Sequence, residues 1–294
     1  MKHYLSILLF CVVPMVVAED RLAAEKPKAD RAALVKALTF YASFDETVQA
    51  DVGKGDKTLS TRFNHETEKG NFVVEKSFDA KVFRIAKGKG ISGAALECTD
   101  VLPRNGRVFF PAKDNLAFKK DGWSGAASVW INTDPNTLFK TKFCDPIQIT
   151  QKGANNGGIW FDFNDAKPRD MRHGLFAAVP EGAKGISEDD PQAPMVRVPK
   201  VGFKNGEWHH VVLSWQNLDT GKKDALSVLY IDGKRIGAIE GRALSMDWDM
   251  DKTGIYVAVN FVGLLDELAL FDRALSMDEV ALLYGRPGVL SEKK

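Results

Sequence analysis

The sequence predicts a mostly β domain, and two strand patterns and one turn support this prediction. Apolar and polar residues alternate with a period of two over residues 207–215, which is typical of a strand with one buried face. The same pattern, rich in β-branched and aromatic residues, recurs over residues 228–231. Asp232-Gly233 follows directly, and this pair predicts a type I′ hairpin turn, because both central residues of that turn need positive φ.

The rest of the chain is expected to contribute more strands, a long loop and little helix. Residues 166–200 are polar and rich in Pro and charge, which predicts a long loop relieved by a minor strand over 174–179. Helical segments are expected from Ala32 to Leu38 and after Ser276. Strands are expected over residues 38–45, 94–98, 107–111, 122–133, 146–150, 158–164 and 261–271, with two more between 71 and 85.

Two of the expected strands carry mixed aromatic and polar faces. In one, Trp130 and Asn132 share a face, and in the other Trp160, Asp162 and Asn164 do. Aromatic rings beside amide and carboxylate groups suit sugar recognition, because a pyranose has an apolar face and a rim of hydroxyls. These five residues are the predicted ligand-binding set. The alternative is that the aromatic rings form a second layer of core.

Four segments in the C-terminal third resemble one family. They are Trp208-His209-His210-Val211-Val212, Leu229-Tyr230-Ile231-Asp232-Gly233, the run from Gly263 to Phe271, and Arg273-Ala274-Leu275-Ser276. In this order and spacing they resemble the LamG-like (laminin G-like) jelly-roll domain of the concanavalin A-like lectin/glucanase superfamily. The resemblance implies an all-β, two-sheet antiparallel jelly-roll sandwich over residues 38–286, with a short C-terminal helix. Residues 19–37 would form a flexible or helical leader and residues 287–294 a tail.

The resemblance implies binding more strongly than catalysis. Hydrolases of this fold carry a Glu-x-Asp-x-x-Glu strand that supplies their paired carboxylates, and this spacing does not occur in the sequence. Asp266 and Glu267 are adjacent, so on a regular strand they would face opposite sides. We therefore expect a noncatalytic binding or adhesion module, with carbohydrate as the favoured partner. A structural or protein-interaction module of an extracellular or cell-envelope assembly is the alternative, and a polysaccharide-cleaving hydrolase or lyase is less favoured.

Calcium is the expected cofactor. Relatives of this fold hold a structural cation where the last Asp-containing strand meets the first, which corresponds to Asp266 and Asp45. In the alternative interpretation, Asp266 and Glu267 cap turns or pair with Arg273. Residues 247–251 imitate the start of an EF-hand, but Lys252 stands where that loop requires Gly.

The paired histidines, His209 and His210, are expected to be structural. Adjacent side chains diverge on a strand, and no nearby Cys or third His completes a zinc site.

The first 18 residues predict export. Met1-Lys2-His3 precedes an apolar run too short for a comfortable membrane span, as in a signal peptide, so a secreted, periplasmic or cell-envelope location is expected. Removing residues 1–18 takes one basic residue from the 40 and none of the 39 acidic ones, leaving a chain close to neutral. This balance gives no electrostatic reason to expect nucleic acid as a partner.

Of the 3 cysteines, two lie beyond residue 18: Cys98 and Cys144. An exported chain can oxidise such a pair, so a disulfide between them is one expectation. Two buried free thiols are the other, because sequence spacing does not establish the geometry of a bridge.

Overall fold

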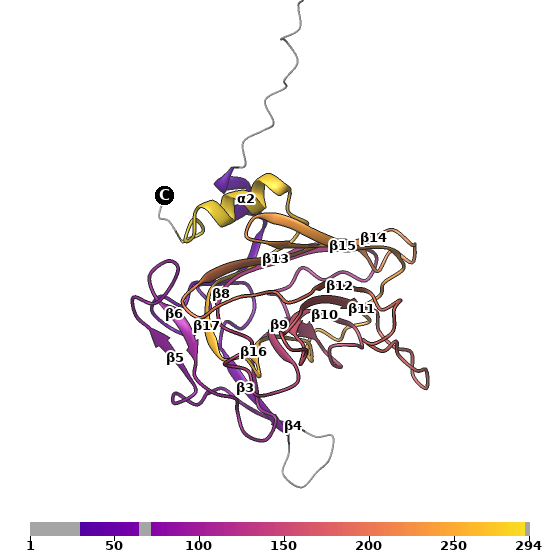
Figure 1. Ribbon diagram of the computed structural model, residues 1–294. Helices are drawn as coiled ribbons and strands as arrows, with labels where there is room; N and C mark the ends of the chain where they lie inside the picture. Colours follow the sequence, from indigo (N-terminus) through magenta and orange to yellow (C-terminus); the bar gives the residue numbers. More distant parts are fainter. Residues whose placement is uncertain (1–29, 65–71, 292–294) are drawn as a thin grey trace, which may run out of the picture.

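The computed structural model describes residues 30–64 and 72–291, which form two antiparallel sheets and two helices (Figure 1). The predicted all-β sandwich with a short C-terminal helix is confirmed. The expected signal peptide, residues 1–18, lies outside the described residues, as does the expected leader up to residue 29. No helix in the described part of the chain is long and apolar enough to cross a membrane.

The first sheet, sheet A, has nine strands. Its main path ends at β15 on one side and β2 on the other, and β6 pairs with β17 and with β5 off this path. In spatial order, the strands of the main path are followed by the two others: β15 (Lys234–Arg242), β14 (Ala225–Ile231), β13 (Trp208–Leu218), β8 (Trp123–Asn132), β17 (Gly263–Phe271), β1 (Leu38–Ala42) and β2 (Val52–Gly53), then β6 (Ala95–Cys98) and β5 (Phe83–Ala86).

The second sheet, sheet B, has eight strands and lies across the core from sheet A. In spatial order they are β12 (Met195–Val198), β11 (Met171–Phe176), β10 (Gly158–Phe163), β9 (Cys144–Thr150), β16 (Gly254–Val259), β7 (Arg107–Pro111), β3 (Ser60–Asn64) and β4 (Phe72–Glu75). The long loop expected over residues 166–200 is interrupted by β11 and β12, so these residues supply an edge of sheet B.

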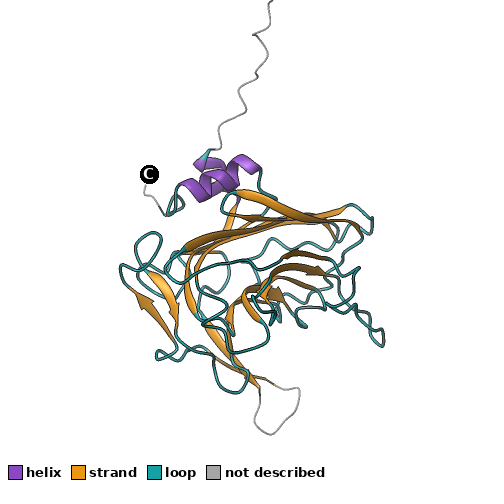
Figure 2. Ribbon diagram, in the orientation of Figure 1, coloured by secondary structure: helices purple, strands orange, loops and turns teal. Residues whose placement is uncertain are grey.

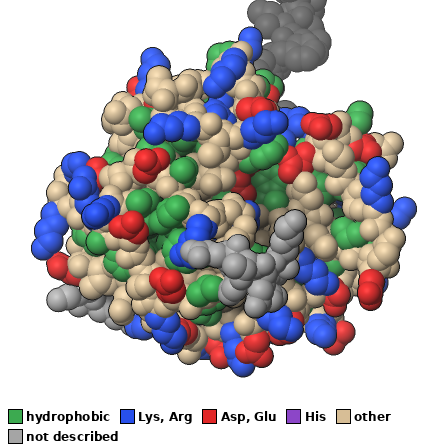
Figure 3. Space-filling view, turned by 90° about the horizontal axis from the view of Figure 1, so that it is seen from below, with side chains coloured by type: hydrophobic (Ala, Val, Ile, Leu, Met, Phe, Trp, Pro, Cys, Tyr) green, Lys and Arg blue, Asp and Glu red, His purple; other side chains and the backbone are tan. Residues whose placement is uncertain are grey.

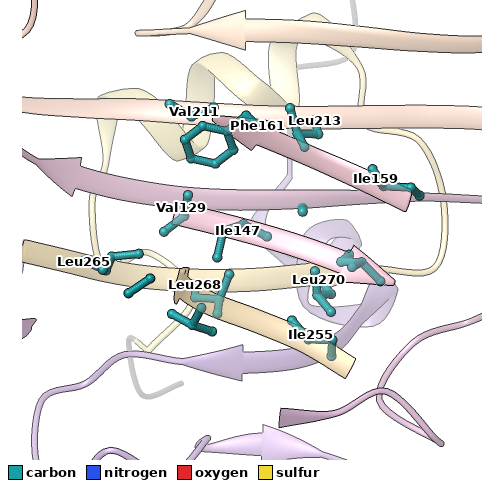
Figure 4. Close-up of a cluster of buried hydrophobic side chains, with 14 of the residues drawn as sticks. Val129, Ile147, Ile159, Phe161, Val211, Leu213, Ile255, Leu265, Leu268 and Leu270 are labelled. Carbon is teal, nitrogen blue, oxygen red and sulfur yellow. The ribbon is translucent and has the colours of Figure 1, made fainter. Parts of the chain in front are cut away.

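The core is built from the alternate residues of both sheets that face inward. Figure 4 shows Val129 and Leu213 of sheet A lying against Ile147 and Phe161 of sheet B, all almost fully buried. Burying one such side chain stabilises the fold by about 1.5–3 kcal/mol. This shared layer fixes which side chains of each strand are left on the outer faces of the sandwich.

The two helices cover the outer face of sheet A and leave sheet B without a helix among the described residues (Figure 2). α1 (Arg31–Ala37) places Leu34 against this face, and α2 (Met277–Gly285) places Val280 and Leu283 there. α1 occupies the segment expected to turn helical, and Asp30 caps it by accepting a hydrogen bond from Ala32 N at 2.9 Å. The outer face of sheet B is therefore covered only by strands and loops in the described part of the chain.

The hairpin predicted at Asp232-Gly233 is confirmed. β14 and β15 are joined by these two residues, with Ile231 opposite Lys234. Both turn residues have positive φ, 50° and 74°, as a type I′ turn requires.

Candidate binding face on sheet B

A cavity of about 230 Å³ opens on the outer face of sheet B. Seen from the β3 and β4 side, the surface is hollowed, and hydrophobic, acidic and basic side chains lie close together there (Figure 3). Strands β7, β9, β10 and β16 and the loops beside them line the cavity with Arg107, Phe143, Asp145, Gln148, Gly153, Ala154, Trp160, Asp162, Glu188, Val259 and Asn260.

Trp160 forms part of the cavity wall and is held flat against the sheet. Its Nε1 donates to the carbonyl of Ala154 at 2.9 Å, and its ring stacks on Phe176 with centroids 5.7 Å apart. Gly174 lies opposite on β11, and a Cβ there would come within 2.2 Å of the indole. Glycine at this position therefore allows the indole to lie across the neighbouring strand.

A buried ion-pair network runs along one side of the cavity. Arg172 donates from Nε to Asp162 Oδ1 at 2.9 Å, from Nη2 to Asp162 Oδ2, and to Glu188 Oε2 at 2.7 Å. Asn155 Nδ2 donates to the other oxygen of Glu188, also at 2.7 Å. Burial raises the pKa of Asp162 to about 6, although its hydrogen bonds to Arg172 oppose the shift. The network fixes the position of Glu188, which comes from the long segment between β11 and β12.

Three groups beside this network also line the cavity. Gln148 Oε1 is buried without a hydrogen-bond partner. Burial, followed by the charge of Asp162, raises the pKa of Asp145 well above its usual value. The ring of Phe143 stands 44 % exposed over the cavity. An open ring beside polar groups without partners suits a ligand with an apolar face and several hydroxyls.

The structure brings together only part of the predicted ligand-binding set. Trp160 and Asp162 both line the cavity. Asn164, at the end of β10, shapes the adjoining turn instead, because its Oδ1 accepts from Ala166 N at 3.2 Å and from Asp170 N at 3.0 Å.

Trp130 and Asn132 lie on the outer face of sheet A, on the other side of the sandwich. Trp130 is 5 % exposed and stacks between His210 and Tyr284 of α2, with centroids 4.9 and 5.6 Å away. Asn132 Oδ1 accepts from Gly206 N at 2.9 Å. Trp130 and Trp160 therefore do not share a groove. Trp130 points away from the core on β8 of sheet A, and Trp160 points away from the core on β10 of sheet B, on the opposite side of the sandwich.

Sequence reasoning overlooked Gln148, Asp145 and Phe143. The signal for Gln148 was its place between Ile147 and Ile149, two core residues of β9. Alternation alone puts such a glutamine on the outer face of a strand. Alternation does not show that the amide oxygen of Gln148 is buried beside a cavity.

A second cluster joins Asp45, Asp266 and Glu267 near the end of β1. Asp45 Oδ1 accepts from Ala94 N at 2.9 Å, and Asp266 Oδ2 accepts from Ser92 N at 3.2 Å, so one Gly-rich loop contacts both carboxylates. The expectation that Asp266 and Glu267 face opposite sides is wrong. A bulge in β17 places one extra residue between its pairings with β8, and Glu267 has φ 54°, so Leu265 and Leu268 point inward while both carboxylates point outward.

These carboxylates are crowded and poorly compensated. Burial raises the pKa of Asp266 to about 8 and that of Glu267 to about 7, and the charge of Asp45 adds to both shifts. Tyr41 Oη donates to Glu267 Oε2 at 2.8 Å, whereas Glu267 Oε1 is buried without a partner. The alternative pairing with Arg273 does not occur, because Arg273 is bound to Glu279 at 2.6 Å.

Other candidate metal ligands in the sequence are engaged elsewhere. In the described residues, Asp45, Asp266 and Glu267 included, no three His, Cys, Asp or Glu side chains are arranged to hold a metal ion, so calcium at that cluster would have to draw its carboxylates together. Asp249 pairs with Lys252 at 2.9 Å and Asp251 with Lys113 at 2.7 Å, so the EF-hand-like run is an exposed set of ion pairs. His209 stacks on Phe203.

Of the two expectations for Cys98 and Cys144, the structure has the second, two buried free thiols. Both thiols are free and buried, Cys98 in β6 of sheet A and Cys144 in β9 of sheet B. Cys144 Sγ instead lies 3.2 Å from Thr141 Oγ1. Both side chains belong to the core cluster between the two sheets.

Comparison with protein families gives one match, to the family described as the concanavalin A-like lectin/glucanases superfamily, over residues 105–281. A comparison of the sequence with curated proteins found no significant match.

Solved structures with a similar fold include sugar-binding and toxin domains. Domain 4 of an extracellular arabinanase from Geobacillus stearothermophilus, solved with arabinotriose, has 17% identity and a TM-score of 0.48, covering 84% of this chain and 98% of that one. The binding domain of Paraclostridial Mosquitocidal Protein 1 has 13% identity and a TM-score of 0.51, covering 85% and 52%. The sialidase CBM40 of Ruminococcus gnavus, bound to α2,3-sialyllactose, has 14% identity and a TM-score of 0.44, covering 65% and 96%.

Proposed function

Because the chain belongs to the concanavalin A-like lectin/glucanases superfamily, we propose that it is a noncatalytic module that binds carbohydrate in the cavity on sheet B. The observation that carries the proposal is the buried, unpartnered Gln148 Oε1 beside the exposed ring of Phe143. A sugar hydroxyl would satisfy the amide oxygen, whose lack of a partner costs about 1–3 kcal/mol. The ring offers an apolar surface to the sugar face.

Binding without catalysis is supported by the state of Asp162. Both of its oxygens accept hydrogen bonds from Arg172, so this carboxylate is held by the fold and is not poised as a nucleophile. The measurement is release of reducing ends or unsaturated ends from polysaccharides. Turnover abolished by Asp145→Asn or Asp162→Asn would contradict the noncatalytic assignment.

Replacing Phe143 by alanine tests the binding surface. We expect Phe143→Ala to weaken binding about tenfold. Stacking of an aromatic side chain on the flat face of a ligand contributes on the order of 1–3 kcal/mol. Binding is measured by isothermal titration with the polysaccharide that a glycan array selects. Ile236→Ala is the matched control, because Ile236 is 42 % exposed, like Phe143, but lies in β15 of sheet A.

Two outcomes of this experiment would redirect the assignment. Equal loss of binding in both variants would place the ligand elsewhere. No binding to any glycan on the array would favour the structural or protein-interaction alternative, for which the exposed apolar residues of the edge strand β4, Phe72 and Val74, offer a contact surface.

We also infer that calcium binds at the cluster of Asp45 and Asp266, with Glu267 beside them. The residues fit such an ion: they supply hard oxygen ligands, and the unpartnered Glu267 Oε1 lacks a positive group. Gly90 and Gly93 allow the loop to approach the carboxylates, because a Cβ would lie 2.7 Å from Asp266 Oδ2 at the first position and 2.1 Å from Asp45 Oδ1 at the second. Bound calcium would supply charge compensation and hold the loop to β1 and β17.

Calcium is expected to raise the melting temperature by about 5 °C at a hundredfold excess over its Kd, relative to chelator, because it binds the folded state selectively. Thermal unfolding with calcium and with EDTA measures the shift. Asp266→Asn should abolish it, while Asp247→Asn, in an exposed ion pair, should retain it. Identical melting curves with calcium and EDTA for the wild type would rule out the site.

The proposed location is outside the cytoplasm, supported by the basic tip and apolar run within residues 1–18. Amino-terminal sequencing of the protein recovered from the periplasm or medium checks it, with Glu19 as the expected first residue.

A further inference from the structure

Two arginines face each other on the outer face of sheet B, and no carboxylate of the described residues forms an ion pair with either. Arg62 of β3 pairs directly with Arg107 of β7, and residues that are directly opposite in an antiparallel pair share a face. Arg107 also lines the cavity that holds Gln148 and Asp145. The pair therefore extends the cavity toward β4.

Neither guanidinium is neutralised within the part of the chain that the structure describes. No ion pair joins Arg62 or Arg107 to a carboxylate there, whereas Arg172 on the same face is bound to Asp162 and Glu188. Like charges directly opposite each other destabilise a sheet. On the Arg107 side, burial and then the charge of Asp162 raise the pKa of Asp145 well above its usual value, while the charge of Arg107 opposes this shift.

Aromatic rings hold Arg62 in place. Its Cζ lies 4.0 Å from the ring centroid of Phe72 and 5.1 Å from that of Tyr256. Burial lowers the pKa of Arg62, and the charge of Arg107 adds to this effect. A cation packed between rings, beside a second cation, is ordered before any ligand arrives, so less rotamer entropy is lost on binding.

We propose that Arg62 and Arg107 form a subsite for an acidic group of the glycan, so that the ligand of sheet B is an acidic polysaccharide. Guanidinium groups bind carboxylates and sulfate esters through paired, charge-assisted hydrogen bonds. This inference rests on the proposed carbohydrate-binding function and adds the substrate class. Binding an anion would also remove the repulsion between the two arginines.

Two matched pairs of polymers test the subsite. They also distinguish a carboxylate from a sulfate ester as the group that the arginines bind. Polygalacturonate is compared with its methyl ester for carboxylates, and dextran sulfate with dextran for sulfate esters. We expect the wild type to bind at least one acidic polymer about tenfold more tightly than its neutral counterpart, with the preference falling as NaCl is raised. The acidic polymer that is preferred identifies the group.

Arg62→Gln is expected to weaken binding of that acidic polymer about tenfold and to leave binding of the neutral one unchanged, because Arg62 lies outside the cavity lining. Arg107→Gln is expected to weaken binding of the acidic polymer about tenfold and to affect the neutral one less. Arg235→Gln in β15 removes the same charge from sheet A and is the control. Arg107→Gln should unfold at or above the wild-type temperature without ligand, since it removes half of a like-charge pair.

The outcomes distinguish this inference from the proposed function. Equal binding of acidic and neutral polymers, weakened by Phe143→Ala but not by Arg62→Gln, would overturn the acidic subsite and keep the carbohydrate site. A melting temperature lowered by several degrees in Arg107→Gln would assign the pair to folding and overturn the subsite. No binding of any of the four polymers, in a protein that also binds no glycan on the array, would mean that the proposed function itself had failed.

Discussion

At the scale of single residues, glycines and carboxylates depend on each other in the loop between β5 and β6. Gly93 has φ 73° and sits where a side chain would collide with Asp45. Gly88, in the same loop, has φ 70° with open space around the position of a Cβ. The sequence alone does not distinguish these two glycines. Their contacts show that Gly88 is needed only for the turn, whereas Gly93 also allows a close approach to a carboxylate.

Gly93→Ala is expected to lower the free energy of unfolding by about 3 kcal/mol, from left-handed strain of about 1–2 kcal/mol plus the displacement of Asp45. Gly88→Ala should cost only the strain. Urea denaturation of both variants measures the difference, and equal costs would contradict the role given to Asp45.

At the scale of elements, turns and helix caps are determined by residues close together in the sequence. The bulge in β17 is determined by the strand that pairs with it. The Asp232-Gly233 turn needs only its own two residues. The bulge at Asp266 needs β8, because Asp266 pairs with Trp130 and Ala269 with Ser128. The two adjacent carboxylates thus share a face because of how β17 pairs with β8.

The helix α2 has a cap that can be tested in isolation. Ser276 Oγ accepts from Glu279 N at 3.2 Å, and Glu279 Oε2 accepts from Ser276 N at 2.9 Å, forming a capping box. Ser276→Ala is expected to cost about 1 kcal/mol of stability. Ser276→Asp, which retains an acceptor, should recover most of it in thermal unfolding. A matching loss in both variants would show that the cap is not what holds the helix.

At the scale of the whole molecule, two neutral histidines make the sandwich sensitive to acid. Burial lowers the pKa of His173 to about 4 and that of His210 to about 3. His173 is enclosed by bonds to Trp160 O at 2.9 Å and Ser227 Oγ at 2.8 Å. Both pKa values are depressed below the unfolded value of about 6.5, so the unfolded chain binds more protons between pH 6.5 and 4. Their stabilising contribution is full above pH 6.5 and declines as pH falls.

We therefore expect each histidine to account for roughly 2 kcal/mol of the stability lost between pH 7 and pH 4.5. Urea denaturation at both pH values measures this for the wild type and for His173→Gln and His210→Gln. Each variant should show a shallower pH dependence, whatever its stability at pH 7. A slope equal to that of the wild type would mean that the histidine is already protonated in the fold.

The sequence by itself determined the strand periodicity, the type I′ turn, the terminal helix and the superfamily, because these depend on local pattern and on motifs in fixed order. It also predicted Trp160 and Asp162, which line the cavity, and Asp45 and Asp266, which contact one loop. Only the tertiary structure decided where the cavity lies: α2 covers Trp130, while Trp160, which is only 1 % exposed, forms part of the wall of the cavity on sheet B. Alternation tells which residues leave a strand on the same side, but the packing of the other sheet and of the helices decides whether that side meets solvent or protein.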